Sequence, residues 1–228
     1  MQDKQGSSNV DFYNSMRKKW WARIIMWGFD LLYHQYSWIY DFAAWLVSAG
    51  KWNDWIRAAG WLVPKGPLLD MGCGKGILLQ HAVERDIPAI GLDESPQMLR
   101  HSSRLLNERD LRLIRAVGQS IPIKAGVFQT VTATFPAPYI FEPATLNEIR
   151  RVLKPGGKMI ILVTGEVTGS TLHEKIIRFA YGLFGFSRTP DSLQTYLQEP
   201  LRKCGFMGHV EWIAGPNARL LVIVAQPV

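Results

Sequence analysis

Two periodicities of hydrophobic and polar positions alternate along the chain from about residue 60 onward. Short apolar runs predict strands, and stretches whose apolar positions recur every three to four residues predict helices. The predicted strands end at Asp70 and Asp93 and then cover 111–117, 128–135, 158–164, 209–213 and 218–225; the predicted helices cover 75–85, 96–108 and 143–154. Pro155-Gly156-Gly157 is a strong breaker and is expected to end the last of these helices. Because strands and helices alternate in doubly wound folds, the pattern predicts an α/β protein with a doubly wound sheet.

A glycine loop follows the first of these strands, in the segment Leu68-Leu69-Asp70-Met71-Gly72-Cys73-Gly74-Lys75-Gly76. A strand, a tight turn and a helix N-terminus in this order hold nucleotide-like cofactors in α/β folds. A dinucleotide pyrophosphate is anionic and would be repelled by Asp70, whereas S-adenosylmethionine presents an ammonium group and a sulfonium there. The dinucleotide pattern G-x-G-x-x-G also fails, because its third glycine would fall at Ile77. The loop therefore predicts a methyl-donor cofactor; taken alone, Asp70 also fits a strand-end turn residue or a helix cap.

A second acid supports this interpretation. The next predicted strand ends at Asp93, about twenty residues after the loop, and an acid at that distance accepts hydrogen bonds from ribose hydroxyls. Dehydrogenases share this feature, so Asp93 indicates a nucleoside-containing cofactor without choosing among cofactors.

From about Leu68 onward the chain resembles the class I S-adenosylmethionine-dependent methyltransferases, and within them the ubiquinone and menaquinone biosynthesis methyltransferases. Four segments carry the resemblance: 69–76 (LDMGCGKG), 91–99 (GLDESPQML), 118–123 (GQSIPI) and 149–157 (IRRVLKPGG). The resemblance implies a Rossmann-like, doubly wound sheet of seven strands whose last strand is antiparallel, with S-adenosylmethionine as the cofactor.

The resemblance also assigns roles to single positions. It implies that Asp70 lies near the methionine ammonium of the cofactor and that Asp93 holds the ribose. The other implied cofactor contacts come from Gly72, Cys73 and Gly74 in the loop, Glu94 and Met98 after the second strand, Gln119 and Ser120 after the third, and Thr134 and Phe135 after the fourth.

The chain departs from the family at two of these places. Relatives usually carry an acid where Gln119 stands, accepting from the adenine amino group, and a glutamine carbonyl can still accept. Many relatives carry His or Asp after the fourth strand, whereas this chain has Thr134-Phe135-Pro136-Ala137-Pro138-Tyr139. No base is visible there, so no catalytic residue is assigned.

Aromatic residues crowd the first part of the chain. Eight of the nine tryptophans lie within the first 61 residues, at positions 20, 21, 27, 38, 45, 52, 55 and 61. A helical wheel puts the polar residues Lys19, Arg23, Asp30 and His34 on one narrow stripe, and most of the remaining helix surface is apolar. So wide an apolar face needs a large surface to cover it. Residues 1–60 are therefore expected to form a helical extension, separate from a methyltransferase domain over 61–228.

Three surfaces are open to this extension. It can pack over the cofactor as a lid, it can meet a membrane headgroup region through its Trp and Tyr rings and Arg17-Lys18-Lys19, or it can contact a dimer partner. A spanning helix and a secretory signal are not expected, because Asp30, His34 and Asp41 interrupt the apolar run and no cleavage pattern follows it.

Few side chains suit proton transfer or a lid contact near the expected site. Tyr40 is our candidate for a lid residue that reaches the cofactor, because relatives carry a Tyr-Asp pair at a similar distance before the loop; a core tyrosine is the alternative. The bases that the sequence offers are His34, Asp41, Glu166 and His173, each of which also fits a surface or structural role. No metal site is expected.

Composition narrows the functional classes. At 228 residues, with two cysteines and a net charge of +7, the chain fits a cytoplasmic enzyme without a disulfide framework. We expect in-line methyl transfer to a small lipophilic acceptor, such as a quinone precursor or lipid-like molecule, since the aromatic lid and the apolar content of the segment 166–187 favour one. An RNA methyltransferase, favoured by the basic charge but by no RNA-binding module, and a non-catalytic S-adenosylmethionine-binding protein remain as alternatives. DNA is not an expected partner.

Overall fold

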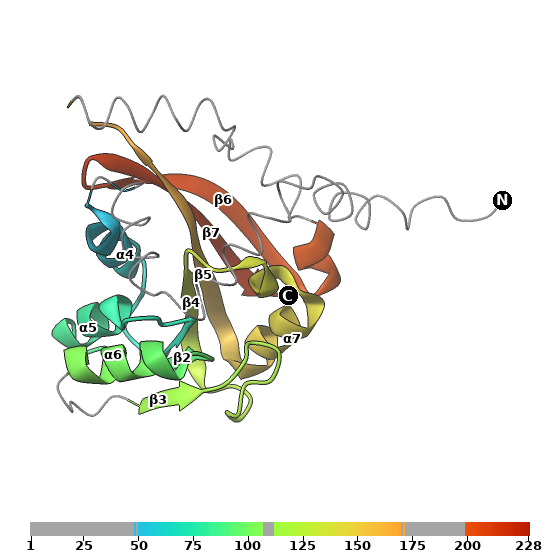
Figure 1. Cartoon of the computed structure of the whole chain (residues 1–228). Coiled ribbons are helices and arrows are strands. Elements are labelled where there is room, and N and C mark those ends of the chain that lie inside the picture. The colour runs from blue at the N-terminus through green and yellow to red at the C-terminus, as the bar shows by residue number, and fades with distance from the viewer. Residues whose placement is uncertain (1–47, 49, 107–111, 170, 172–198) are drawn as a thin grey trace, which may run out of the picture. The chain divides into compact units, whose positions relative to one another are not determined.

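Strands form one seven-stranded mixed sheet in the part of the chain that the computed structural model describes, which is residues 48, 50–106, 112–169, 171 and 199–228. The strand order is β3-β2-β1-β4-β5-β7-β6 (Figure 1). The elements are α4 (Trp52–Gly60), β1 (Leu68–Met71), α5 (Ile77–Glu84), β2 (Ala89–Asp93), α6 (Pro96–Leu106), β3 (Arg112–Arg115), β4 (Phe128–Thr134), the 3-10 turn η1 (Pro138–Phe141), α7 (Pro143–Val152), β5 (Leu153–Val167), β6 (Phe206–Gly215) and β7 (Ala218–Pro227).

The strand directions confirm the doubly wound sheet expected from the sequence. β1 pairs in parallel with β2 and β4, β2 with β3, and β4 with β5. β7 runs antiparallel to both of its neighbours, β5 and β6, as the family resemblance implies. The carboxyl ends of β1, β2 and β4 therefore meet at one edge of the sheet, which is where this class of fold binds ligands.

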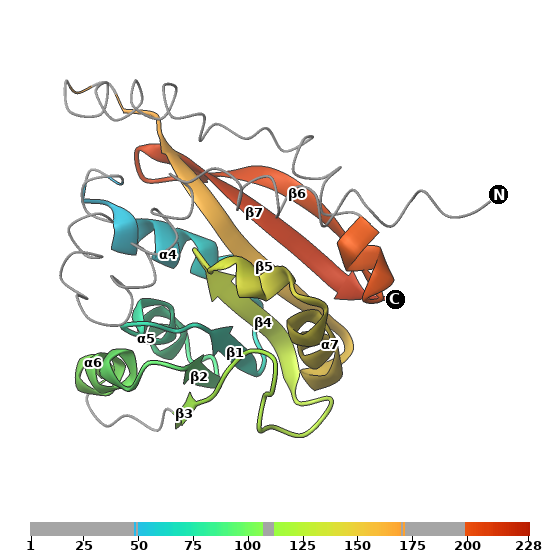
Figure 2. The ribbon, with the colours of Figure 1, turned by 45° about the vertical axis from the view of Figure 1, so that its right-hand side comes forward.

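Alternating side chains divide the core between two helical layers. Leu69 and Met71 of β1 face the cluster that contains Leu146 and Ile149 of α7, whereas Leu68 packs with Ala82 of α5. The same alternation along β5 and β7 covers both faces of the central sheet, and Figure 2 shows α5 and α6 on one side and α7 on the other. Strands buried on both faces are expected to be nearly continuous apolar runs, and β1 and β7 are.

The largest difference from the sequence expectation lies at the start of β5. The sequence predicts a helix to Lys154 and a strand from Lys158, but α7 ends at Val152 and β5 begins at Leu153. Phe128 of β4 pairs with Leu153 and Thr130 pairs with Lys158, so the Pro-Gly-Gly segment forms an irregularity inside the pairing. Pairing with β4 therefore includes Pro155-Gly156-Gly157 in strand β5, although proline and glycine are expected to interrupt a strand.

Helix α4 packs onto the sheet through its tryptophans. Trp55 is 1% exposed and lies in a cluster with Leu162 and Leu220, and its indole N–H donates to the carbonyl of Pro216 at 3.4 Å. A Cβ at Gly165 would lie 2.6 Å from the Trp55 ring, so the strand needs glycine where this ring crosses it. α4 is thereby held at the end of β5 and beside the carboxyl edge of β4.

Candidate cofactor site

Asp70 lies at the carboxyl end of β1 with its side chain fully buried. Its Oδ1 accepts a hydrogen bond of 2.9 Å from the Thr132 hydroxyl on the neighbouring strand β4. Its Oδ2 is also buried and has no hydrogen-bond partner among the described residues. Burial, opposed by the Thr132 hydrogen bond and reinforced by the nearby Asp93, raises the pKa of Asp70 to about 7.

A buried carboxylate oxygen without a hydrogen-bond partner is a favourable binding position for a cation or a hydrogen-bond donor, because an unpaired buried charge is strongly unfavourable. An ammonium group supplies both. The chemistry at the end of β1 therefore fits the methionine end of S-adenosylmethionine, and Asp70 is the residue that would hold it.

The glycine loop leads from β1 into α5 and leaves room beside its backbone. Gly72 has φ +65, a conformation that side-chain-bearing residues rarely adopt, and a Cβ built on it would lie 3.0 Å from the Tyr139 hydroxyl. At Gly74 the nearest atom to such a Cβ is the Gly72 carbonyl oxygen, at 3.9 Å. Cys73 between them is buried with a free thiol, and burial raises its pKa above the usual range, so it is a packing residue rather than a nucleophile.

Asp93 ties the loop to the end of β2. Its Oδ2 accepts from the backbone N–H of Gly74 at 2.9 Å, and its Oδ1 accepts from the N–H of Ser95 at 2.8 Å. Burial raises the pKa of Asp93, and these two hydrogen bonds oppose the shift. Each carboxylate oxygen keeps a lone pair, so Asp93 can hold the loop and still accept from ribose hydroxyls.

The residues expected around the adenine lie at the ends of β2 and β3. Glu94 is exposed, whereas Met98 on α6 is 4% exposed, and its backbone N–H donates to the Ser95 hydroxyl. Gln119 donates its amide N–H to Glu142 at 2.9 Å, which leaves its carbonyl oxygen as the group able to accept from an adenine amino group. Ser120 is exposed in the adjacent turn. These cofactor contacts stay predictions, at positions that the fold places along one edge.

Tyr139 is a candidate that the sequence analysis missed. It lies on η1 and packs closely on two glycines. A Cβ built on Gly118 would lie 2.9 Å from the Tyr139 ring, and one built on Gly72 would lie 3.0 Å from the Tyr139 hydroxyl. Burial raises its pKa above the usual range, and the carboxylates Asp93 and Asp70 raise it further. The phenol therefore stays neutral over the glycine loop. In the sequence, the pair Pro138-Tyr139 does not indicate that the tyrosine ring would lie against Gly72 and Gly118.

The expected bases do not converge on this site within the described residues. Glu166 accepts two hydrogen bonds from the Arg219 guanidinium, at 2.9 and 2.8 Å, and is thereby held in an ion pair. His34, Tyr40, Asp41 and His173 lie outside the described residues.

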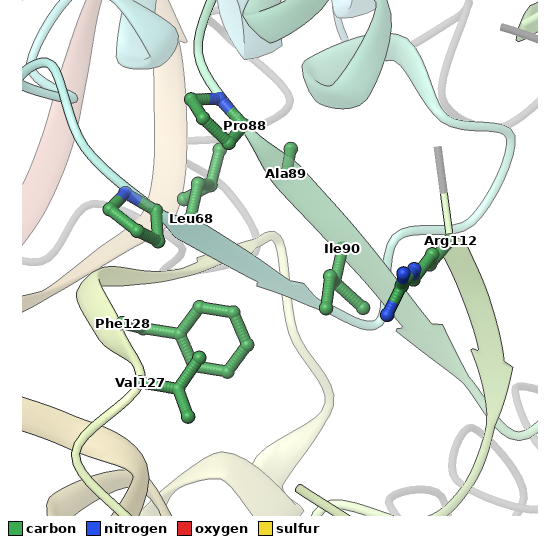
Figure 3. A pocket seen from close by; sticks show the side chains of 8 residues that line it. Leu68, Pro88, Ala89, Ile90, Arg112, Val127 and Phe128 are labelled. Carbon is green, nitrogen blue, oxygen red and sulfur yellow. The ribbon is translucent and has the colours of Figure 1, made fainter. Parts of the chain in front are cut away.

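A shallow hollow lies at the opposite edge of the sheet (Figure 3). Its lining includes Leu68, Ala89, Phe128 and Arg112, each the first residue of its strand. Because ligands of doubly wound sheets bind at the carboxyl edge, and because this lining is mostly apolar with one charged side chain, the hollow is not the cofactor site.

Replacement of Gly72 by alanine is expected to weaken S-adenosylmethionine binding about 10-fold, because the new methyl group would enter the space between the loop and Tyr139. Gly126→Ala is a matched control: Gly126 has φ +66, but a Cβ there meets nothing within 4 Å. Both variants should lose about 1 kcal/mol of unfolding free energy through backbone strain. Calorimetric titration of S-adenosylmethionine should separate them, and equal affinities would place the cofactor away from Gly72.

Known proteins share this sequence pattern. Residues 69–161 match the family described as "Methyltransferase domain". Demethylmenaquinone methyltransferase of Symbiobacterium thermophilum is 33% identical over 156 residues, which is 64% of this chain and 60% of that protein. Ubiquinone/menaquinone biosynthesis C-methyltransferase of Dinoroseobacter shibae is 29% identical over 184 residues, which is 72% of this chain and 71% of that protein. The chain thus spans less than two thirds of the length of the first relative.

Solved structures share the fold. Phosphoethanolamine N-methyltransferase 2 of Haemonchus contortus, solved in complex with S-adenosylmethionine, superposes with a TM-score of 0.54 at 18% identity, over 78% of this chain and 53% of that chain. A likeness at this identity establishes the architecture, and it confirms the Rossmann-like fold expected from the sequence.

Proposed function

We propose that this chain, whose residues 69–161 match the family described as "Methyltransferase domain", transfers a methyl group from S-adenosylmethionine to a small lipophilic acceptor of the quinone-precursor type. The buried Asp70 carboxylate, with one oxygen unpartnered beside the glycine loop, is the observation that carries the cofactor assignment. The names of the two quinone-pathway relatives support the acceptor class.

The chain's own residues would act by binding and positioning. Asp70 would hold the ammonium, and Asp93 would hold the ribose while fixing the loop through Gly74. The cofactor brings the reactivity: its methyl group is bonded to a sulfonium, so the acceptor's electron pair forms the new bond while the breaking C–S bond returns its pair to sulfur. The protein must then align the acceptor with that bond and exclude water.

The acceptor's proton also needs a destination. Glu166 is held by Arg219 and is not a ready base. We therefore infer that the acceptor arrives in its nucleophilic form, as a reduced quinone can, and that its proton leaves to water after transfer.

The N-terminal segment remains part of this proposal. Its residues 1–47 lie outside the described part of the chain, so the lid, membrane and dimer alternatives stay predictions. Among the described residues, no helix has the length and apolarity needed to cross a bilayer. We propose a cytoplasmic protein that reaches a lipophilic acceptor by peripheral contact with the membrane surface.

The test uses purified full-length protein, tritiated-methyl S-adenosylmethionine and a cell extract separated into lipid, small-molecule, RNA and protein pools. Label in the organic phase is expected and would support the lipophilic acceptor. Label confined to RNA would overturn it in favour of an RNA methyltransferase. Binding of S-adenosylmethionine without label in any pool would instead indicate a non-catalytic cofactor-binding protein.

A further inference from the structure

Gln119, in the turn after β3, is hydrogen-bonded to a carboxylate at the start of α7. Its side-chain amide N–H donates to Glu142 Oε2 at 2.9 Å, and its carbonyl oxygen has no hydrogen-bond donor among the described residues. An ionised carboxylate has only acceptor atoms, whereas an amide has an NH₂ on one side and an oxygen on the other. Glu142 therefore determines which end of the Gln119 amide is left for a ligand, and that end is the carbonyl oxygen.

The backbone of Glu142 is held on both sides. Its N–H donates to the Tyr139 carbonyl at 3.0 Å, and its C=O accepts from the Leu146 N–H at 2.9 Å in the first turn of α7. Pro143 follows it at the start of the helix, where the proline ring presets the helical φ. The carboxylate thus extends from a backbone position that two hydrogen bonds fix.

Two more side chains of α7 hold the backbone just after this turn, where the chain leaves β3 and passes the helix (Figure 2). Glu148 accepts from the Ile121 N–H at 2.8 Å. Arg151 donates to the carbonyls of Ile121 and Ile123 at 2.8 and 2.7 Å. Arg151 also donates to both oxygens of Glu148 at 2.7 Å, which lowers the pKa of Glu148. This pair, the α7 clamp, fixes the position of the segment, so the neighbouring amide can be turned without movement of the backbone.

The strand order places the turn where the base of the cofactor would lie. β1, β2 and β3 are neighbours in the sheet, and Asp70 and Asp93 stand at the carboxyl ends of the first two. A cofactor with its ammonium at Asp70 and its ribose at Asp93 brings its base to the end of β3. Gly118, next to Gln119, packs at this edge, because a Cβ built on it would lie 2.9 Å from the Met71 methyl group.

We propose that Glu142 makes this site selective for a base with an amino group by fixing Gln119 as a hydrogen-bond acceptor. The exocyclic amino group of adenine donates, so it pairs with the Gln119 carbonyl oxygen. The keto oxygen of hypoxanthine accepts, so it would face that oxygen with no proton between them. The inference rests on the proposed function and extends it to the residue that determines which base the site binds. Glu142 acts through Gln119 and is a positioning residue.

The test compares S-adenosylhomocysteine with S-inosylhomocysteine, in which hypoxanthine replaces adenine, by calorimetric titration of the full-length protein. Glu142→Gln is the informative variant, because a glutamine there offers either an oxygen or an NH₂ and so pairs with both orientations of Gln119. We expect the S-adenosylhomocysteine Kd to rise about threefold and the S-inosylhomocysteine Kd to fall about threefold, so that discrimination drops about 10-fold. A loss of folding or a displaced segment would weaken both ligands and would improve neither.

Further variants separate orientation from position. In the double variant Gln119→Glu/Glu142→Gln, the group at position 119 can only accept, so the preference for adenine should return at least to the wild-type level. Arg151→Lys keeps the charge but loses the planar fork that reaches two carbonyls, so it should raise both Kd values by a similar factor of about five and leave their ratio unchanged. Glu211→Gln is the matched control, because Glu211 is 47% exposed on β6, at the opposite edge of the sheet from β3. Neither Kd should change in this control.

The results distinguish this role from the reaction itself. If the wild type binds S-adenosylhomocysteine but Glu142→Gln changes the ratio of the two Kd values no more than Glu211→Gln does, the role of Glu142 is overturned and the proposed function stands. The same conclusion follows if Arg151→Lys changes the ratio as much as Glu142→Gln. If the wild type binds neither ligand, the cofactor assignment fails, and the role of Glu142 fails with the proposed function.

Discussion

Replacement of Asp70 by asparagine is expected to raise the Kd for S-adenosylmethionine about 100-fold. The substitution keeps the shape of the side chain and removes the charge that would face the cofactor ammonium. Loss of one partner of a buried charge pair costs about 2–5 kcal/mol, and about 3 kcal/mol corresponds to this change in affinity. Calorimetric titration of the full-length protein at pH 8, where the wild-type carboxylate is mostly ionised, measures the effect.

Asp54→Asn is the control for this experiment. Asp54 is an acid on α4 whose side chain is 46% exposed; it lies 3.4 Å from the ammonium of Lys51 and is not among the residues expected to contact the cofactor. Its replacement should leave the affinity unchanged. An Asp70→Asn variant that binds S-adenosylmethionine within about fivefold of the wild type would contradict the assignment of the ammonium to this carboxylate.

The sequence sufficed to predict that Asp70 and Asp93 lie at the ends of neighbouring strands beside the glycine loop, because the signals for this placement are local. An acid at a strand end and glycines at fixed offsets are visible in a window of nine residues. The parallel order of the strands then brings distant strand ends to one edge, which the alternation of strands and helices already implies. The fold, and the meeting of Asp70, Asp93 and the glycine loop at one edge of the sheet, therefore followed from short-range pattern plus topology.

The partners of Asp70 could not be predicted in the same way. Thr132 is 62 residues away and meets the carboxylate only through the register between β1 and β4. Tyr139 reaches Gly72 because a 3-10 turn after β4 folds back over the loop. Such approaches depend on how a turn is placed in space, and residue type alone carries little information about that.

The same limit applies to the start of β5 and to Phe135. A Pro-Gly-Gly segment has low intrinsic strand propensity, yet pairing with β4 determines its assignment. Phe135 is a typical strand residue by propensity, yet its backbone is left-handed. In both cases tertiary contacts override local preference. Phe135 directly follows β4 at the carboxyl edge of the sheet, where functional sites of this fold lie and where local and global preferences are expected to conflict.

The cofactor-free protein should respond to Asp70→Asn in the opposite sense, by becoming more stable. The folded protein raises the pKa of Asp70 from 3.8 to about 7, so the fold favours the neutral carboxyl. The stability that this group contributes is fully present below its unfolded-state pKa and is lost as the pH rises through the folded-state pKa. At pH 8 the wild type therefore carries an unfavourable buried charge, and asparagine relieves it.

A shift of this size corresponds to at most about 4 kcal/mol of unfolding free energy. Urea unfolding of both proteins without cofactor should show a variant more stable at pH 8 than the wild type, with the difference shrinking toward pH 4. Since Asp93 and other groups titrate in both proteins, the difference between the two unfolding free energies isolates the contribution of Asp70.

Saturating S-adenosylmethionine should stabilise the wild type much more than the variant, because ligand binding to the folded state adds its own free energy. A variant that is less stable than the wild type at pH 8 without cofactor would show that the ionised carboxylate already has a partner in the fold. A residue that destabilises the fold alone and stabilises it with cofactor is the signature expected of a binding site rather than of a structural ion.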